Sequence, residues 1–129
     1  VDCNSGRGGD LLPPRPLRIL DLSLDDPAEN LALEEVLVER LDAGTSPPTL
    51  RFWESPSPFV VIGVGQRIAQ EADLDACAAD GVPVLRRCSA GGCVLQGPGC
   101  LNFSLFLTYD TWPEVRDIRP SYCAILGRL

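Results

Sequence analysis

The order of the short apolar runs constrains this chain more than any other feature of its sequence. The runs come in pairs and triplets: 49–54 and 59–64 are separated only by a Ser-Pro-Ser-Pro turn, and 83–87, 93–96 and 101–108 follow one another across glycine-containing turns. Runs of this kind, bounded by turn residues, are typical of strands. A doubly wound sheet needs a helix between nearly all of its strands. We therefore expect an α/β (α+β) domain with a mixed, largely antiparallel sheet flanked by helices.

Three helices are predicted among these strands, together with an additional strand at 17–23. The first helix spans 27–43, where Asp26 supplies an N-cap and Pro27 the first helical residue. The second spans 71–80, and the third begins at Pro120. Apolar residues recur at helical spacing in the first helix and predict its inner face: Leu33, Val36, Leu37 and Leu41.

The first sixteen residues differ in composition from the rest. Residues 1–16 are rich in glycine, proline and aspartate and predict a flexible N-terminal tail, whereas 17–129 have the length of one domain or part of one.

The charged residues exclude several kinds of chemistry. All eleven basic residues are arginine, because the chain has no lysine, and it has no histidine either. A Walker-type phosphate loop, a lysine Schiff base and a Ser-His-Asp triad are therefore excluded. The net charge of −7 disfavours nucleic acid as a partner. No apolar run of membrane-spanning length or signal-peptide core occurs, so we expect no membrane partner and a cytoplasmic location.

Six cysteines occur, and without a secretory signal we interpret them as reduced thiols. Cys88, Cys93 and Cys100 lack both C-x-x-C spacing and a histidine partner, so no metal site is expected. We interpret these three as small buried core thiols.

The segment 86–92, which we call the arginine–glycine loop, is the strongest candidate for ligand binding. Arg86 and Arg87 lead into small residues, whose backbone amides can approach an anion closely, and arginine itself pairs with phosphate or carboxylate. Successive residues of a strand point to opposite faces, so one arginine should face a pocket and the other should pair with surface carboxylates. The alternative is a hairpin turn flanked by two solvated arginines. Gly63 and Gly65 form a weaker glycine motif, which we interpret as a close-packed strand end.

Three linked stretches resemble the lipoate-protein ligase A family, within the biotin/lipoate ligase catalytic-domain fold. Asn30-Leu31-Ala32-Leu33-Glu34 matches N-x-A-x-E, and Trp53 with Pro58 to Gln66 matches W…P…V-x-I-G-x-x-Q. Arg86 to Val94 and Gly99 to Ser104 resemble R-R-x-S-G-G-G-x-V and G-N-x-N-F-S. The resemblance covers 17–129 in the family's order.

The resemblance implies an enzyme that adenylates lipoate or octanoate with ATP and Mg²⁺ and delivers the acyl group to a lysine of a lipoyl domain. The implied partners are lipoyl domains of 2-oxoacid dehydrogenase complexes or the glycine cleavage H protein. Ala90 and Gln96 depart from the family pattern, where glycine and often histidine stand. The implied contacts to lipoate or the acyl adenylate are Arg86, Arg87, Ser89, Gly91, Gly92, Gln96 and Asn102.

The family also uses a lysine in the second half of its domain, and this chain has none. We therefore expect an incomplete domain in which 17–129 form the N-terminal half, with no catalytic residue and no activity alone. Two alternatives stay open. One is an octanoyl or lipoyl transferase, suggested by the Gly97-Pro98-Gly99 turn, in which Cys88, Cys93 or Cys100 would accept the acyl group. The other is a truncated, non-catalytic acyl-binding module.

Overall fold

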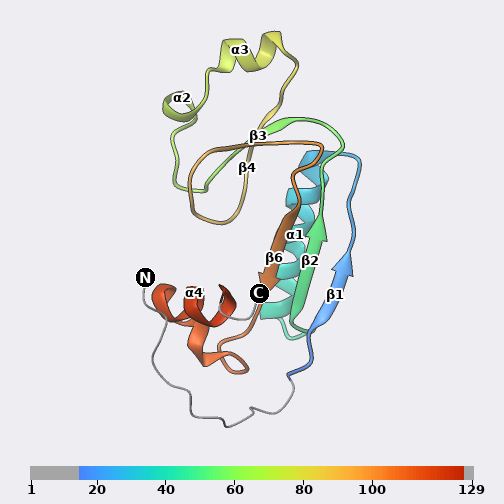
Figure 1. The fold of residues 1–129 in the computed structure, drawn as a ribbon, viewed down its shortest axis with the longest axis vertical. Helices are drawn as coiled ribbons and strands as arrows, with labels where there is room; N and C mark the ends of the chain where they lie inside the picture. The colour runs from blue at the N-terminus through green and yellow to red at the C-terminus, as the bar shows by residue number, and fades with distance from the viewer. Residues whose placement is uncertain (1–14, 127–129) are drawn as a thin grey trace.

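The computed structural model describes residues 15–126, so residues 1–14 of the predicted tail lie outside the described residues. Strands and helices follow one another in the predicted order (Figure 1). The strands are β1 (Arg18–Asp21), β2 (Thr49–Trp53), β3 (Phe59–Ile62), β4 (Val84–Arg86), β5 (Val94–Gln96) and β6 (Asn102–Phe106). The helices are α1 (Pro27–Asp42), α2 (Ile68–Glu71), α3 (Leu74–Ala79), the 3-10 helix η1 (Pro113–Val115) and α4 (Ile118–Leu126).

The strands form two small mixed sheets, with the orders β1-β2-β6 and β4-β3-β5. The predicted mixed α+β fold is confirmed, but the strands divide into two sheets, each with one parallel and one antiparallel pairing. The parallel pairings follow from the helices, because α1 connects β1 to β2, and α2 and α3 connect β3 to β4. A crossover through a helix returns the chain in the same direction.

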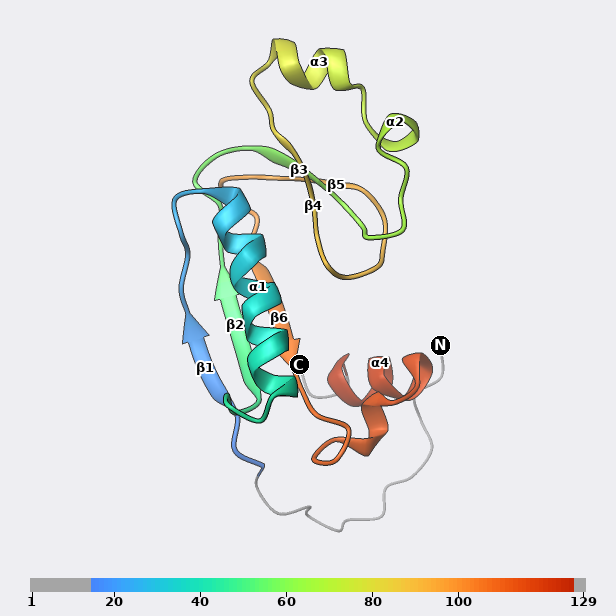
Figure 2. The same cartoon turned by 180° about the vertical axis from the view of Figure 1, so that it is seen from behind.

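Helix α1 begins where the sequence predicts and covers one face of the β1-β2-β6 sheet (Figure 2). The side chain of Asp26 accepts a hydrogen bond from the backbone N–H of Ala28, and Pro27 occupies the first turn. The predicted inner face is wrong at Val36, whose side chain is 43% exposed. Asn30 is instead fully buried, because the helix packs on a partly polar sheet face.

The burial pattern of β2 explains this polar face. Thr49, Arg51 and Trp53 are buried, whereas Leu50 and Phe52 alternate with them and point to the other side of the sheet. That other side forms, with η1 and α4, an apolar groove of about 240 Å³. The two faces of this sheet are therefore chemically different: α1 packs on the side that holds an arginine, and α4 on the apolar side.

The predicted helix at 71–80 is wrong in its bounds, because two short helices occupy this region. Ala72 is extended, and the side chain of Asp73 accepts from the backbone N–H of Ala76 to begin α3. The last helix, α4, starts at Ile118, two residues before the predicted start. Within residues 15–126 no helix has the length and apolar character needed to cross a membrane.

A small apolar core joins the two sheets. Leu31 of α1, Trp53 of β2, and Phe59 and Val61 of β3 are buried against one another. The rings of Trp53 and Phe59 stack with their centroids 6.3 Å apart. This junction holds the two sheets beside α1 and creates the space described next.

Candidate functional site

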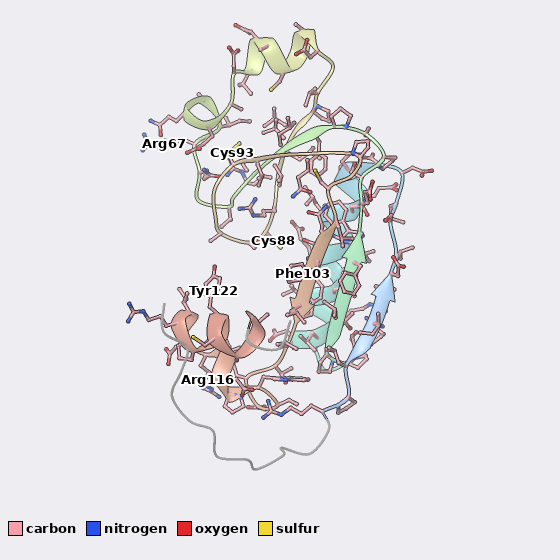
Figure 3. The ribbon with its side chains drawn as sticks, viewed as in Figure 1. Arg67, Cys88, Cys93, Phe103, Arg116 and Tyr122 are labelled. Carbon is pink, nitrogen blue, oxygen red and sulfur yellow. The ribbon has the colours of Figure 1, made fainter. Side chains whose placement is uncertain are left out.

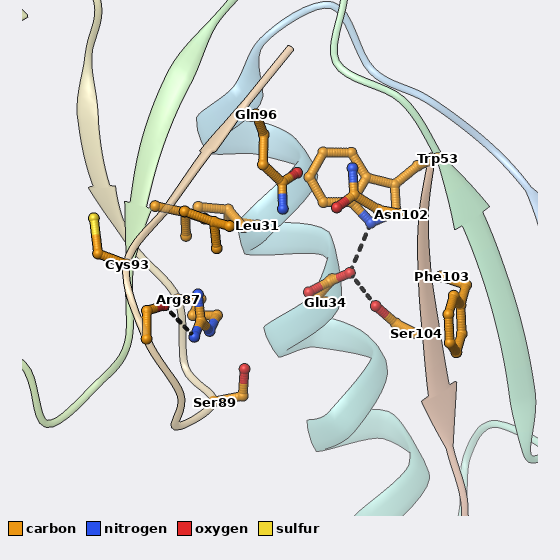
Figure 4. A pocket seen from close by; sticks show the side chains of 13 residues that line it. Leu31, Glu34, Trp53, Arg87, Ser89, Cys93, Gln96, Asn102, Phe103 and Ser104 are labelled. Atoms are coloured by element: carbon orange, nitrogen blue, oxygen red, sulfur yellow. Dashed lines mark hydrogen bonds between the residues drawn. The ribbon is translucent and has the colours of Figure 1, made fainter. Parts of the chain in front are cut away.

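A cavity of about 440 Å³ lies between the two sheets and beside α1 (Figure 4). We call it the central cavity. Every layer of the fold contributes to its wall: α1, strands from both sheets, and the arginine–glycine loop. The lining residues are Leu31, Glu34, Trp53, Val61, Arg87, Ser89, Gly92, Cys93, Val94, Gln96, Asn102, Phe103 and Ser104.

One wall of the central cavity is an acidic network centred on Glu34. Its Oε1 accepts a hydrogen bond from Trp53 Nε1 at 2.8 Å and another from Ser104 Oγ at 2.5 Å. The same oxygen lies 3.7 Å from Nη1 of Arg51. Glu34 therefore fixes the indole of Trp53 and ties α1 to both β2 and β6.

Arg51, behind this wall, is fully buried, with its side chain 0% exposed. It donates to the backbone carbonyls of Leu22 and Asn30 and to Asn30 Oδ1, at distances of 2.7 to 3.3 Å. Burial lowers the pKa of Arg51 from its ordinary value, and the nearby carboxylate of Glu34 opposes that shift. A buried guanidinium needs this many acceptors because an unpaired one is very costly.

The opposite wall is the arginine–glycine loop. The guanidinium of Arg87 donates to the backbone carbonyls of Ala90 and Gly92, with distances of 2.9 to 3.3 Å, and thereby closes the loop on itself. Ser89 lies on the same loop and also lines the cavity (Figure 4). The side chain of Arg87 thus sits at the cavity wall, with the loop held around it.

Of the two arginines of the loop, only Arg87 lines the central cavity, in agreement with the prediction that one of them faces a pocket. The prediction that the other would pair with carboxylates is wrong. Nη1 of Arg86 donates to the carbonyls of Gly63, Val64 and Gln66 at 2.8 to 3.1 Å. The reason is that the turn after β3 presents three acceptors directly beside the end of β4. Arg86 therefore fixes this turn.

Gly63 and Gly91 make the close approach that holds the loop against β3. A Cβ at Gly63 would lie 2.3 Å from the carbonyl oxygen of Gly91, so only glycine fits there. Gly91 has a φ of 117°, a region that favours glycine. The interpretation of Gly63 as a close-packed strand end is confirmed. Gly91 supports the loop but does not line the cavity.

Two amide side chains line the cavity. Oε1 of Gln96 is buried and, within the part of the chain that the structure describes, has no hydrogen-bond partner. Nδ2 of Asn102 donates to the carbonyl of Cys100 at 3.1 Å. An orphaned buried acceptor is costly unless a ligand or water satisfies it, so Gln96 offers a place for a donor.

The cysteines differ from the prediction. Cys88 and Cys100 are exposed, so the interpretation as buried core thiols is wrong for both: loops rather than strands carry them. Figure 3 shows Cys88 near the tip of the arginine–glycine loop. Desolvation raises the pKa of Cys88, and the charges of Glu35 and Glu34 raise it further. Within residues 15–126 no group of three or more potential metal ligands is present.

Five of the seven predicted contact residues meet in one cavity: Arg87, Ser89, Gly92, Gln96 and Asn102. Arg86 and Gly91 are near it and support the loop. The prediction did not include Glu34, Trp53 and Ser104, although all three belong to the motifs that carry the family resemblance. The presence of Glu34, Trp53 and Ser104 in these motifs was the sequence signal that could have identified them.

The fold and the cavity define a class of protein: an α+β domain with a cavity of small-molecule size between two sheets. The chain matches the family described as the lipoyl protein ligase A/B catalytic domain over residues 26–128. It therefore belongs to this family.

Relatives within the family have different activities. The octanoyltransferase LipM of Moorella thermoacetica is 32% identical over 118 residues, which are 92% of this chain and 43% of that protein. A lipoate-protein ligase A whose crystal structure has ATP bound is 34% identical with a TM-score of 0.62, covering 68% of this chain and 35% of that one. A putative lipoate protein ligase of T. acidophilum with bound lipoic acid has the same identity and TM-score, and the match covers 68% of this chain and 36% of that one. The chain thus spans less than half of each.

Proposed function

We propose that this chain forms the acyl- and adenylate-binding half of a lipoate-protein ligase, which adenylates lipoate with ATP and transfers the lipoyl group to a lysine of a lipoyl domain. One observation carries the proposal: the lining of the central cavity combines apolar side chains, among them Leu31 and Val61, with the arginine and small residues of the arginine–glycine loop. An aliphatic acid needs both, because its chain must leave water while its carboxylate keeps hydrogen-bond donors.

The proposed contacts follow the geometry of the cavity. Arg87, Ser89 and the backbone amide of Gly92 would donate hydrogen bonds to the carboxyl and phosphate oxygens, which carry negative charge in the adenylate. To do so, Arg87 would donate its hydrogen bonds to ligand oxygens instead of to the carbonyls of Ala90 and Gly92. Gly91 would act by supporting the loop. The two amides, Asn102 and Gln96, would contact the ligand from β6 and β5. Arg86 would act by fixing the turn after β3.

The activating step is not assigned to this chain, which contains no lysine. ATP, Mg²⁺ and lipoate are the proposed substrates of the whole enzyme; the ATP-bound and lipoic-acid-bound relatives support ATP and lipoate. Its proposed protein partners are lipoyl domains of 2-oxoacid dehydrogenase complexes or the glycine cleavage H protein. We also propose that the protein is cytoplasmic.

Calorimetric titration of the whole protein with lipoate, octanoate and lipoyl adenylate tests the binding role. We expect saturable binding, weakened at least about tenfold by Arg87→Met, because a charge-assisted contact is lost. Arg67→Met, an exposed arginine outside the cavity, is the matched control. Binding of no ligand would contradict the proposal. Binding without any ATP-dependent ligation by the whole protein would instead favour the non-catalytic module.

A second candidate is an octanoyltransferase, favoured by the similarity to LipM and by the Gly97-Pro98-Gly99 turn. A cysteine would then attack an acyl thioester. The raised pKa of Cys88 disfavours it as the nucleophile, because the thiolate is the reactive form. Cys93, which lines the cavity, is better placed. Mass spectrometry of the whole protein incubated with octanoyl acyl-carrier protein, with each cysteine replaced by serine in turn, would reveal an acyl-enzyme; absence of any adduct rejects this candidate.

A further inference from the structure

The turn after β3, residues 63–66, is closed by Gln66. Oε1 of Gln66 accepts a hydrogen bond from the backbone N–H of Gly63 at 2.8 Å, and the backbone N–H of Gln66 donates to the carbonyl of Gly63 at 3.1 Å. Gly63 is buried, so water cannot replace these partners unless the turn opens. Gln66 therefore satisfies both polar groups of the Gly63 backbone.

The closed turn holds the middle of the arginine–glycine loop. The backbone N–H of Val64 donates to the carbonyl of Ser89 at 3.0 Å. At the start of the loop, the N–H of Arg87 donates to the carbonyl of Ile62, also at 3.0 Å. Residues 89–92 are exposed, so burial contributes little to holding them in place. The position of Ser89 therefore depends on the turn.

The hydrogen bonds of the loop are of two kinds. Those from the guanidinium of Arg87 to the carbonyls of Ala90 and Gly92 lie within the loop, and under the proposed function they are lost when Arg87 donates to a ligand. The bond from Val64 to Ser89 comes from outside the loop and joins two backbone groups, so a ligand does not need to displace it. When Arg87 changes partners, this bond still holds the middle of the loop.

We propose that Gln66 is a positioning residue for the ligand site. By closing the turn it keeps Val64 bonded to Ser89, so the arginine–glycine loop stays in place while Arg87 transfers its hydrogen bonds to a ligand. This inference rests on the proposed function and adds to it a residue outside the lining of the central cavity. The loop is then formed before the ligand arrives, and binding does not require the loop to become ordered.

Residue-resolved amide hydrogen exchange of the whole protein, measured by NMR with and without octanoate, tests the inference. In the unaltered protein the amide of Val64 should be protected in both states. Gln66→Leu removes the acceptor for Gly63 and should speed exchange at Val64 at least about tenfold. The amide of Val60 in β3, which donates to the carbonyl of Pro83, should exchange as before.

Two outcomes of the exchange experiment would overturn the inference. Loss of protection at Val64 when octanoate binds to the unaltered protein would show that the bond to Ser89 does not survive ligand binding, and this result needs no variant to fold. An equal acceleration at Val60 and Val64 in Gln66→Leu would show that the whole sheet has loosened, so that Gln66 serves the fold alone.

Two further variants are matched to Gln66→Leu in calorimetric titration of the whole protein with octanoate. Gln66→Leu should bind at least about tenfold more weakly than the unaltered protein. Gln66→Glu keeps an oxygen acceptor at the same reach, so its affinity and its exchange at Val64 should stay within about threefold of the unaltered values. Gln70→Leu removes the same type of side chain from an exposed position of α2 and should change neither.

The titrations separate this inference from the proposed function. An unchanged octanoate affinity in Gln66→Leu, or an equal loss in Gln66→Glu or Gln70→Leu, would overturn the inference. Failure of the unaltered protein to bind octanoate would instead reject the proposed function, whereas exchange at Val64 would still show whether Gln66 holds the loop.

Discussion

Replacing Arg51 by methionine should be among the most destabilising single changes in this chain. The guanidinium is fully buried, donates to Leu22 and Asn30, and lies 3.7 Å from Oε1 of Glu34. Methionine fills much of the aliphatic volume but leaves the carboxylate and the carbonyls without their donor. Removing one partner of a buried ion pair costs about 3–5 kcal/mol. Because Glu34 retains 14% exposure, we expect a value near the lower end, about 3 kcal/mol.

Urea unfolding followed by circular dichroism measures this cost. With an m-value of about 1.5 kcal/mol/M, the midpoint should fall by about 2 M. The double variant Arg51→Met/Glu34→Gln should recover about 1–2 kcal/mol, because no buried carboxylate then lacks its cation. Arg67→Met, at an exposed position, is the control for loss of an arginine. A cost below about 1 kcal/mol for Arg51→Met, or no recovery in the double variant, would refute this reasoning.

Three further predictions concern the cavity and its loop. Gly63→Ala should weaken octanoate binding at least about tenfold in calorimetry, because its Cβ would overlap the carbonyl oxygen of Gly91. Gly65→Ala, whose Cβ would have no atom within 4 Å, is the control and should bind octanoate normally. Equal effects of the two substitutions would contradict this prediction. Site-resolved alkylation of Cys88 by iodoacetamide should rise at higher pH than that of glutathione, because a raised pKa keeps the thiol neutral to higher pH, and Glu35→Gln should shift the profile back toward lower pH. A profile that Glu35→Gln leaves in place would argue against that charge. Gln96→Leu removes an unpaired buried acceptor, so the free energy of unfolding in urea should stay unchanged or rise by up to about 1 kcal/mol. The affinity for octanoate should fall. Loss of stability without loss of affinity would show that Oε1 of Gln96 serves the fold.

The sequence predicts the beginning of α1 well because its signals are local. Asp26 and Pro27 act within one turn of the helix, and the structure shows the capping hydrogen bond that they predict. The same locality explains the error at 71–80, where the helical pattern hides the new N-cap at Asp73. The helical pattern predicts one continuous helix, whereas a capping residue at Asp73 predicts a new start. The extended backbone at Ala72 shows that the cap determines where α3 begins.

The polar half of the site could not be predicted in this way. A glutamate in a helix and an arginine in a strand usually face water. The inner face of α1 was predicted from its apolar residues alone, so Glu34 was not included. Only the packing of α1 on β2 shows that Glu34 and Arg51 meet. The division into two sheets likewise depends on pairings between strands far apart in the sequence, which alternation within a single strand does not reveal. The arginine–glycine loop was found because its unusual composition is itself local.

The partners of Glu34 also set an order for assembly during synthesis. Arg51 and Trp53 leave the ribosome soon after α1, so the acid meets a cation and an indole donor as soon as β2 can pair. Ser104 lies 70 residues after Glu34 in the chain, and the cavity wall is complete only when β6 has joined β2. The nascent protein can therefore pair its buried charge before the wall of the central cavity is complete.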